Sequence, residues 1–125
     1  MSDWAGKHAL AADDNEDSRK LASLMLKREG FVVSQAADGQ QAVDHAGSSQ
    51  VDLILMDLEM PVLSGLDAIR AIRARGIAPG VRIVGLSAHA DLRVRAECIA
   101  AGANDYLIKP LRMADLTKVL GTLFG

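Results

Sequence analysis

The sequence is poor in several residue types, and each shortage excludes a class of protein. Cys98 is the only cysteine, so the chain can form neither an internal disulfide nor a thiolate metal cluster. Aromatic residues make up 3% of the chain, so the core must be built from aliphatic side chains and methionine. The net charge of −2 leaves no excess of basic residues, which argues against binding to nucleic acid.

Long apolar runs are also missing. No stretch approaches the roughly 20 apolar residues that span a bilayer, and residues 1–7 lack the apolar segment of a signal peptide. We therefore expect a cytoplasmic protein that does not interact with a membrane. A length of 125 residues fits one domain, so we predict a single domain over 1–125 with a flexible tail over residues 1–7.

What the sequence does contain is a regular alternation of short apolar runs with longer segments of helical period. Strands are predicted at His8–Ala12, Phe31–Gln35, Val51–Met56, Val81–Leu86 and Tyr106–Ile108. A helix is predicted at Glu16–Glu29, where Leu21, Leu24 and Met25 recur at helical spacing. Further helices are predicted through Ala42, Val43 and Ala46, from Ser64 to near Gly76, at Asp91–Ala101, and from Met113 to Leu123. This alternation is typical of an α/β fold in which helices connect the strands of a parallel sheet.

Charged and hydroxyl side chains stand where four of the predicted strands end. Asp13 and Asp14 follow the first strand, Asp57 the third, Ser87 the fourth and Lys109 the fifth. The carboxyl ends of parallel strands meet at one edge of a sheet, where ligands bind. Two carboxylates about 4 Å apart repel each other by roughly 4 kcal/mol at an effective dielectric constant near 20, so three of them together require a cation.

The predicted ligands favour Mg²⁺. Carboxylate oxygens without a cysteine or histidine cluster select a hard cation, and few protein ligands suit Mg²⁺ better than Ca²⁺. A carboxylate nucleophile, a hydroxyl group and an ammonium group beside the cation are what a protein needs to accept a phosphoryl group. The simpler alternative is that Asp13, Asp14 and Asn15 only form a turn and cap the first helix.

The residues at these strand ends closely resemble the receiver domain of two-component response regulators. The resemblance rests on Ala12-Asp13-Asp14-Asn15, residues 55–61, Ser64-Gly65, Leu86-Ser87-Ala88 and residues 102–110, and it extends over nearly the whole chain. Residues 87–90 are most similar to receivers of hybrid sensor histidine kinases. The resemblance implies a three-layer, doubly wound (βα)5 flavodoxin-like fold with strand order 2-1-3-4-5, and a cis peptide bond before Pro110.

The resemblance also implies a role for each site residue. Asp57 is the phosphoacceptor and takes its phosphoryl group from a histidine kinase or a histidine phosphotransfer protein. Asp14 and Asp57 bind Mg²⁺ directly, Asp13 binds it through water, and the main-chain carbonyl of Glu59 completes the protein ligands. Lys109 pairs with the phosphoryl group. Such a domain phosphorylates and dephosphorylates itself, and is a signalling module rather than an enzyme.

A conformational switch is implied as well. Ser87 moves toward a phosphoryl oxygen, and Tyr106 turns inward into the space that is vacated. The fourth helix, fifth strand and fifth helix then present the change to a downstream protein target. Glu59 and His89, each two positions after a site residue, tune the loss of the phosphoryl group.

Three alternatives remain at this point. A flavin-binding module shares the fold class, but Asp13 and Asp14 would repel the FMN phosphate where such a module needs backbone N–H groups. A hydrolase of the aspartyl-phosphate type needs an Asp-x-Asp pair, which the first strand end lacks. The third alternative is a receiver-like interaction module that signals without phosphorylation, against which the intact Asp57, Ser87 and Lys109 argue.

Overall fold

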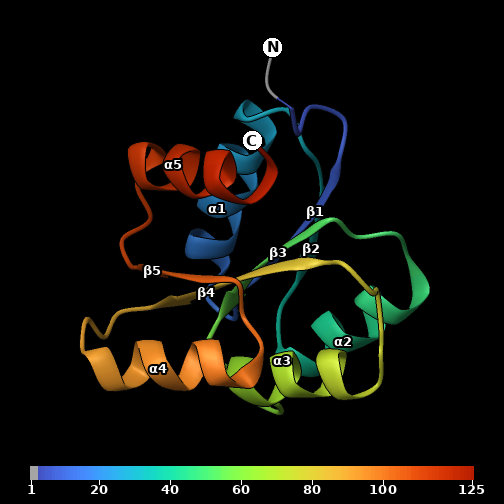
Figure 1. Cartoon of the computed structure of the whole chain (residues 1–125), viewed down its shortest axis with the longest axis vertical. Helices are drawn as coiled ribbons and strands as arrows, with labels where there is room; N and C mark the ends of the chain where they lie inside the picture. The colour runs from blue at the N-terminus through green and yellow to red at the C-terminus, as the bar shows by residue number, and fades with distance from the viewer. Residues whose placement is uncertain (1–2) are drawn as a thin grey trace.

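The computed structural model describes residues 3–125, and Met1 and Ser2 lie outside the described part. Strands and helices alternate along the chain (Figure 1). The strands are β1 (His8–Ala12), β2 (Val32–Ala36), β3 (Leu53–Asp57), β4 (Arg82–Ser87) and β5 (Asp105–Ile108). The helices are α1 (Glu16–Arg28), α2 (Gly39–Ser48), α3 (Gly65–Ala74), α4 (Leu92–Ala101) and α5 (Met113–Phe124).

The strands form one parallel sheet in the order β2-β1-β3-β4-β5, which confirms the predicted topology. Phe31, Val51 and Val81, predicted to begin strands, each precede the observed strand and are buried. The register pairs Leu10 with Ile54 and places β1 and β3 side by side in the middle of the sheet. The Lys109–Pro110 peptide bond is cis, as predicted.

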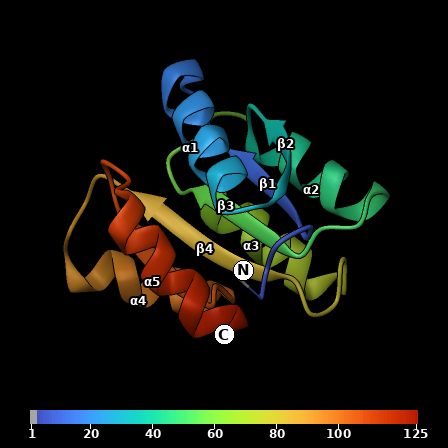
Figure 2. The same ribbon diagram turned by 90° about the horizontal axis from the view of Figure 1, so that it is seen from above.

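Helices cover both faces of the sheet. α1 and α5 lie on one face and α2, α3 and α4 on the other, as two perpendicular views show (Figures 1 and 2). Successive residues of a strand point to opposite faces, so Leu10 and Ile54 belong to the apolar cluster under α2, α3 and α4, whereas Ala9 and Leu53 belong to the one under α1 and α5. Every residue of β3 is buried, as expected for a strand covered on both sides.

Polar side chains begin most of the helices. Asn15, Asp38, Ser64 and Asp91 each accept a hydrogen bond from a backbone N–H of the first turn of α1, α2, α3 and α4. Asn15 therefore caps α1, and the capping alternative is correct for that residue. No helix of residues 3–125 combines the length and the apolar character that crossing a membrane requires.

Residues 4–7 pack on the domain before β1, in contrast to the flexible tail expected over residues 1–7, of which Met1 and Ser2 lie outside the described residues. Trp4 is only 8% exposed and belongs to the same apolar cluster as Phe31. The Gly6 N–H donates to the Gly30 carbonyl at 2.9 Å, and the Val32 N–H donates to the Lys7 carbonyl at 2.9 Å. Burial of the large indole offsets the entropy lost when this short segment becomes ordered.

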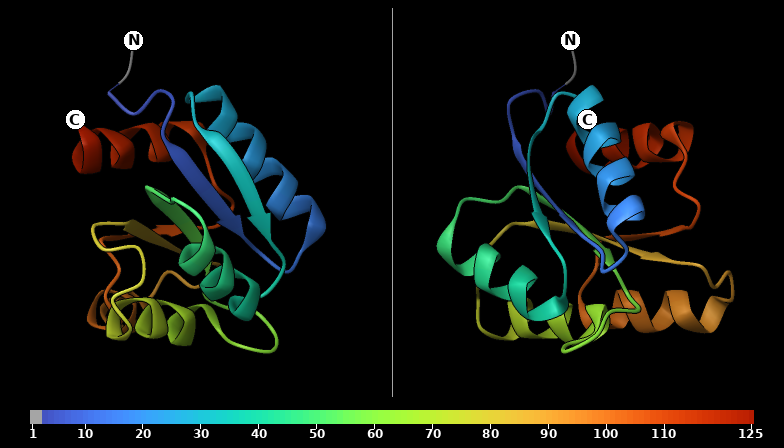
Figure 3. Two further views of the ribbon diagram at one scale, coloured as in Figure 1. Left: turned by 90° about the vertical axis from the view of Figure 1, so that its right-hand side faces the viewer. Right: turned by 180° about the vertical axis from the view of Figure 1, so that it is seen from behind.

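The buried face of α1 also differs from the one that its leucines suggest. Met25 is buried as expected, but Leu21 and Leu24 are each 49% exposed. Ala22, Ser23, Met25 and Leu26 face the sheet instead, with the Ser23 hydroxyl donating to the Arg19 carbonyl at 2.8 Å. Seen from two further sides, α1 lies along β1 and β2 on the face that it shares with α5 (Figure 3).

Candidate functional site

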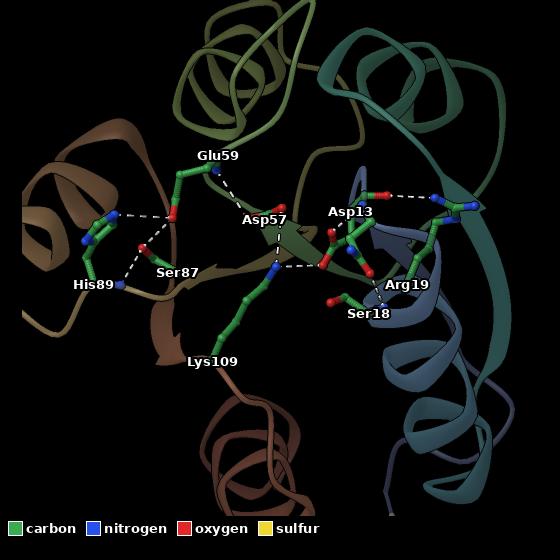
Figure 4. Close-up of polar contacts among 9 residues, drawn as sticks. Asp13, Ser18, Arg19, Asp57, Glu59, Ser87, His89 and Lys109 are labelled. Atoms are coloured by element: carbon green, nitrogen blue, oxygen red, sulfur yellow. Dashed lines mark hydrogen bonds and ion pairs between the residues drawn. The ribbon is translucent and has the colours of Figure 1, made fainter.

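The polar residues predicted from the strand ends meet at the carboxyl edge of the sheet. Asp57 and Ser87 are the last residues of β3 and β4, whereas Asp13 and Lys109 directly follow β1 and β5. Asp13, Asp57 and Ser87 are buried, and the Lys109 side chain extends across the edge toward both carboxylates (Figure 4). Four segments that are distant in the sequence therefore contribute to one site.

Three carboxylates form an acidic cluster at this edge. One oxygen from each of Asp13, Asp14 and Asp57 lies within 4.8 Å of the others. Asp13 and Asp57 are buried whereas Asp14 is exposed, so the cluster opens to solvent on the Asp14 side. The predicted convergence of these residues is confirmed.

Lys109 lies between two of the carboxylates. Its Nζ is 2.8 Å from Oδ2 of Asp13 and 3.4 Å from Oδ2 of Asp57. Burial acts to lower the pKa of Lys109, but the hydrogen bond that its ammonium group donates to Asp13 and the charges of both carboxylates outweigh burial and raise that pKa above its ordinary value. The ammonium group is therefore charged at neutral pH.

Asp57 carries the most perturbed carboxyl group of the site. Burial, followed by the charge of Asp13, raises the pKa of Asp57 to about 7, although Lys109 and the Glu59 N–H act to lower it. That N–H donates to Oδ1 of Asp57 at 3.2 Å. One ammonium group is thus too little positive charge to keep both buried carboxylates fully ionised near pH 7.

The donor set fits a hard divalent cation. Three carboxylate oxygens converge, they come from β1 and β3, and the exposed side leaves room for water ligands. A cation at the cluster would also lower the raised pKa of Asp57, because it favours the ionised carboxylate. These observations support Mg²⁺ in this site, whereas the individual ligand roles of Asp13, Asp14, Asp57 and the Glu59 carbonyl stay predictions.

Ser87, Glu59 and His89 form a second group of contacts beside Asp57 (Figure 4). The Ser87 hydroxyl donates to Oε1 of Glu59 at 2.9 Å and accepts from the His89 N–H at 3.1 Å. Nε2 of His89 lies 3.9 Å from the same Glu59 oxygen. The Ser87 hydroxyl therefore already donates its single proton, to Glu59.

Tyr106 lies inward, between α4 and the sheet. Its side chain is buried within the apolar cluster under α4, and its hydroxyl donates to the main-chain carbonyl of His89. Ser87 contacts the same residue through the His89 N–H. The segment after β4 thus contacts both residues that the resemblance assigns to the switch.

Two residues of the site were not predicted from the sequence. Arg19 donates from Nη1 to the Asp13 carbonyl at 2.9 Å, and from Nε to Oε1 of Gln35 at 3.1 Å. Gly65 lies directly against the backbone of Asp57, because a Cβ added there would lie 2.0 Å from the Asp57 carbonyl oxygen. The Ser64-Gly65 pair could have indicated this close approach, whereas nothing in the spacing of Arg19 tells where its side chain points.

Comparison with known proteins agrees with this geometry. Residues 9–121 match the response regulator receiver domain family. A curated relative is the CAI-1 autoinducer sensor kinase/phosphatase CqsS of Vibrio cholerae, 34% identical over 105 residues that make up 83% of this chain. The chain spans 15% of the length of that sensor kinase.

Solved structures show the same fold. The receiver domain of the sensor histidine kinase PA1611 from Pseudomonas aeruginosa, with a magnesium ion in its active-site cleft, is 40% identical, with a TM-score of 0.87 over 97% of this chain and 99% of that one. The receiver of the Saccharomyces cerevisiae response regulator Ssk1, in complex with the histidine phosphotransfer protein Ypd1, is 28% identical, with a TM-score of 0.87 over 96% of this chain and 90% of that one.

The similarity to receivers of sensor kinases confirms the resemblance found in the sequence. The matched residues 9–121 contain the whole sheet except His8, the first residue of β1, and all the carboxylates of the acidic cluster. The chain belongs to the response regulator receiver domain family of two-component signalling.

Proposed function

We propose that this receiver accepts a phosphoryl group on Asp57 from a phosphohistidine of a partner protein. The observation that carries the proposal is the position of Asp57, which is buried at the sheet edge with Lys109 Nζ at 3.4 Å and with oxygens of Asp13 and Asp14 within 4.8 Å. This arrangement combines a nucleophilic oxygen with positive charge on the side where a phosphoryl group would lie.

The reaction transfers one phosphoryl group between two side chains. An oxygen of the Asp57 carboxylate attacks phosphorus, an O–P bond forms, and the N–P bond of the donor breaks, so that the histidine leaves and takes up a proton. Lys109 contacts the transferred group and offsets its charge, as its position between Asp13 and Asp57 allows. Bound Mg²⁺ would neutralise further charge on the phosphoryl oxygens.

The phosphodonor would reach Asp57 over a groove that adjoins the site. A pocket of about 340 Å³ is lined by Asp13, Ser18 and Lys109 and by apolar side chains that include Leu21, Leu86 and Leu111. The half-exposed Leu24 is a further apolar side chain of α1. The complex of the Ssk1 receiver with a histidine phosphotransfer protein supports a donor of this class. A helix that presents a phosphohistidine fits a pocket that combines apolar side chains with the charged groups of the site.

Phosphorylation would change the contacts of Ser87. Its hydroxyl now donates to Glu59 at 2.9 Å, and a phosphoryl group on Asp57 offers a competing acceptor of higher charge. A hydrogen bond to a charged group contributes about 1.5–3 kcal/mol, so the shift leaves both states populated to some degree. Glu59 and His89 border the same space and would tune the access of water to the phosphoryl group.

The surface of α4, β5 and α5 would transmit the change to a downstream protein target. Leu92 on α4 is 80% exposed, and Ile99 and Ile108 are also exposed large apolar residues of this surface. Tyr106 connects it to the site through the His89 carbonyl. Exposed apolar side chains next to a residue that responds to phosphorylation are suited to a partner that distinguishes the two states.

Acetyl phosphate and Mg²⁺ test the proposal. Mass spectrometry should show a gain of one phosphoryl group in the wild-type domain, no gain without Mg²⁺, and no gain in Asp57→Asn. Asp44→Asn, which changes an exposed carboxylate of α2, is the matched control and should be phosphorylated normally. Phosphorylation that persists in Asp57→Asn would place the acceptor elsewhere, and its absence from the wild type would favour a module that signals without phosphorylation.

A further inference from the structure

The Arg19 side chain turns back from the second turn of α1 and spans the ends of two strands. Its Nη1 donates to the main-chain carbonyl of Asp13, which follows β1, at 2.9 Å (Figure 4). Its Nε donates to Oε1 of Gln35 on β2 at 3.1 Å. The guanidinium therefore uses its planar fork to join one carbonyl of the site to the neighbouring strand.

The carbonyl that Arg19 holds belongs to the peptide bond between Asp13 and Asp14. The preceding peptide is fixed by the sheet, since the Asp13 N–H donates to the Ala36 carbonyl at 3.0 Å. The Asp13 carboxylate is fixed as well, by the Asn15 N–H at 2.9 Å and Lys109 Nζ at 2.8 Å. Arg19 is thus the side-chain contact that sets the plane of the next peptide.

The direction of the Asp14 side chain depends on the orientation of that peptide more than the directions of the neighbouring side chains do. It is exposed, and its carboxylate has no hydrogen bond or ion pair with any residue in the part of the chain that the structure describes, yet one of its oxygens lies within 4.8 Å of those of Asp13 and Asp57. With no side-chain partner to hold it, the carboxylate takes its direction from the backbone. The backbone at this point is set by the bond from Arg19 to the Asp13 carbonyl.

The charge of Arg19 and its hydrogen bond to the Asp13 carbonyl should have opposite effects on the affinity for Mg²⁺. A guanidinium near an acidic cluster repels a divalent cation, so removing it should strengthen Mg²⁺ binding by about twofold if charge alone matters. Removing a group that orients ligands weakens metal binding, typically by 10- to 100-fold. The two effects differ in sign, so one titration distinguishes them.

We propose that Arg19 is a positioning residue for the magnesium site, which holds the Asp13–Asp14 peptide so that the Asp14 carboxylate faces Asp57. The inference rests on the proposed function only in taking Mg²⁺ as the bound cation. It adds to the site a residue that neither touches the phosphoryl group nor ligates the metal.

The test is a calorimetric titration of the full chain with Mg²⁺ alone, without a phosphodonor. We expect Arg19→Ala to bind Mg²⁺ about tenfold more weakly than the wild type. Lys20→Ala is the matched control, because it removes a positive charge from the next residue of α1, where the exposed ammonium pairs with Glu16 at 2.9 Å. That control should bind Mg²⁺ as tightly as the wild type or slightly more tightly. Equal or tighter binding by Arg19→Ala would overturn the inference.

Two further measurements separate positioning from general stability. Phosphorylation of Arg19→Ala by acetyl phosphate should need more Mg²⁺ for its half-maximal rate but reach nearly the wild-type rate at saturation. Amide exchange should accelerate at Asp14 and Asn15 while the sheet stays protected. Exchange that rises throughout the sheet, or a rate that stays low at saturating Mg²⁺, would refute a positioning role.

Gln35→Ala offers an independent check, since it removes the outer anchor of the guanidinium and leaves the Asp13 contact in place. It should weaken Mg²⁺ binding less than Arg19→Ala does, and a larger loss would contradict the inference. If the wild type itself failed to bind Mg²⁺, both the proposed function and this inference would fail. If the wild type binds and Arg19→Ala matches it, only this inference fails.

Discussion

Replacing Asp57 with asparagine should stabilise the metal-free domain while it removes the proposed phosphoacceptor. The Asp57 carboxylate is only 3% exposed, and burial and the charge of Asp13 raise its pKa to about 7. Ionisation of this group therefore costs free energy in the folded state that it does not cost in the unfolded chain. Asparagine keeps the shape and one acceptor oxygen for the Glu59 N–H, but it carries no charge.

The size and sign of the effect follow from the pKa of Asp57. Its folded-state pKa, about 7, lies above the value of 3.8 expected for the unfolded chain. The folded state therefore holds a proton that the unfolded state has lost, and the free energy of unfolding decreases as pH rises from about 4 to about 7. Above pH 7 the loss is complete and amounts to at most about 4 kcal/mol, since each pKa unit corresponds to about 1.4 kcal/mol.

Thermal unfolding by circular dichroism in the presence of a chelator measures this effect. At pH 8, Asp57→Asn should unfold at a temperature up to roughly 15 °C higher than the wild type, given the usual unfolding entropy of a domain of this size. The difference should shrink toward pH 4. Mg²⁺ should raise the melting temperature of the wild type and reduce the gap, because a cation offsets the repulsion that asparagine removes.

The reasoning fails if Asp57→Asn melts at or below the wild-type temperature at pH 8 without metal. It also fails if the difference between the two proteins does not change between pH 4 and pH 8. Asp44→Asn, on the surface of α2, should show neither behaviour, since its carboxylate is exposed.

Three other substitutions test contacts at and behind the site. In Gly85→Ala the new Cβ would lie 2.3 Å from Cys98 Sγ, so urea unfolding should show a loss of about 1–3 kcal/mol, and a smaller loss if Cys98 is first replaced by alanine. Arg73→Ala removes a hydrogen bond of 2.9 Å to the Gly102 carbonyl and should cost about 1–2 kcal/mol in the same assay; an unchanged midpoint would show that water replaces the contact. Lys109→Ala should still bind Mg²⁺ in a titration but accept a phosphoryl group slowly, and loss of metal binding would mean that its role has been misassigned.

The position of the site at the sheet edge was predictable because it depends almost entirely on the order of strands and helices along the chain. Once the apolar runs are assigned to parallel strands, Asp13, Asp57, Ser87 and Lys109 must follow at the same edge, whatever the details of packing. The predicted and observed first residues of the strands differ by one or two positions. These differences did not affect the predicted site, since the site is built on the strand ends. Topology thus determined the position of the site without any knowledge of side-chain conformation.

Side-chain partners could not be predicted in this way. The choice of Glu59 as acceptor for Ser87, and of the Asp13 carbonyl as acceptor for Arg19, depends on rotamers that the sequence pattern does not specify. The buried face of α1 was misjudged for a related reason. Leu21 and Leu24 recur at helical spacing, but both are half-exposed and Leu21 lines the pocket beside the site instead of the core. Periodicity cannot distinguish these two environments.

Because of the position of Trp4, the tryptophan fluorescence of this protein should report unfolding and not ligand binding. It is the only tryptophan of the chain, it is buried beside Phe31, and it precedes β1, whereas the acidic cluster begins after that strand. The five residues of β1 separate the two by roughly 16 Å. Indole emission should therefore follow global unfolding and stay constant when a cation or a phosphoryl group binds, which gives an optical readout of folding that is independent of the chemistry at the opposite edge.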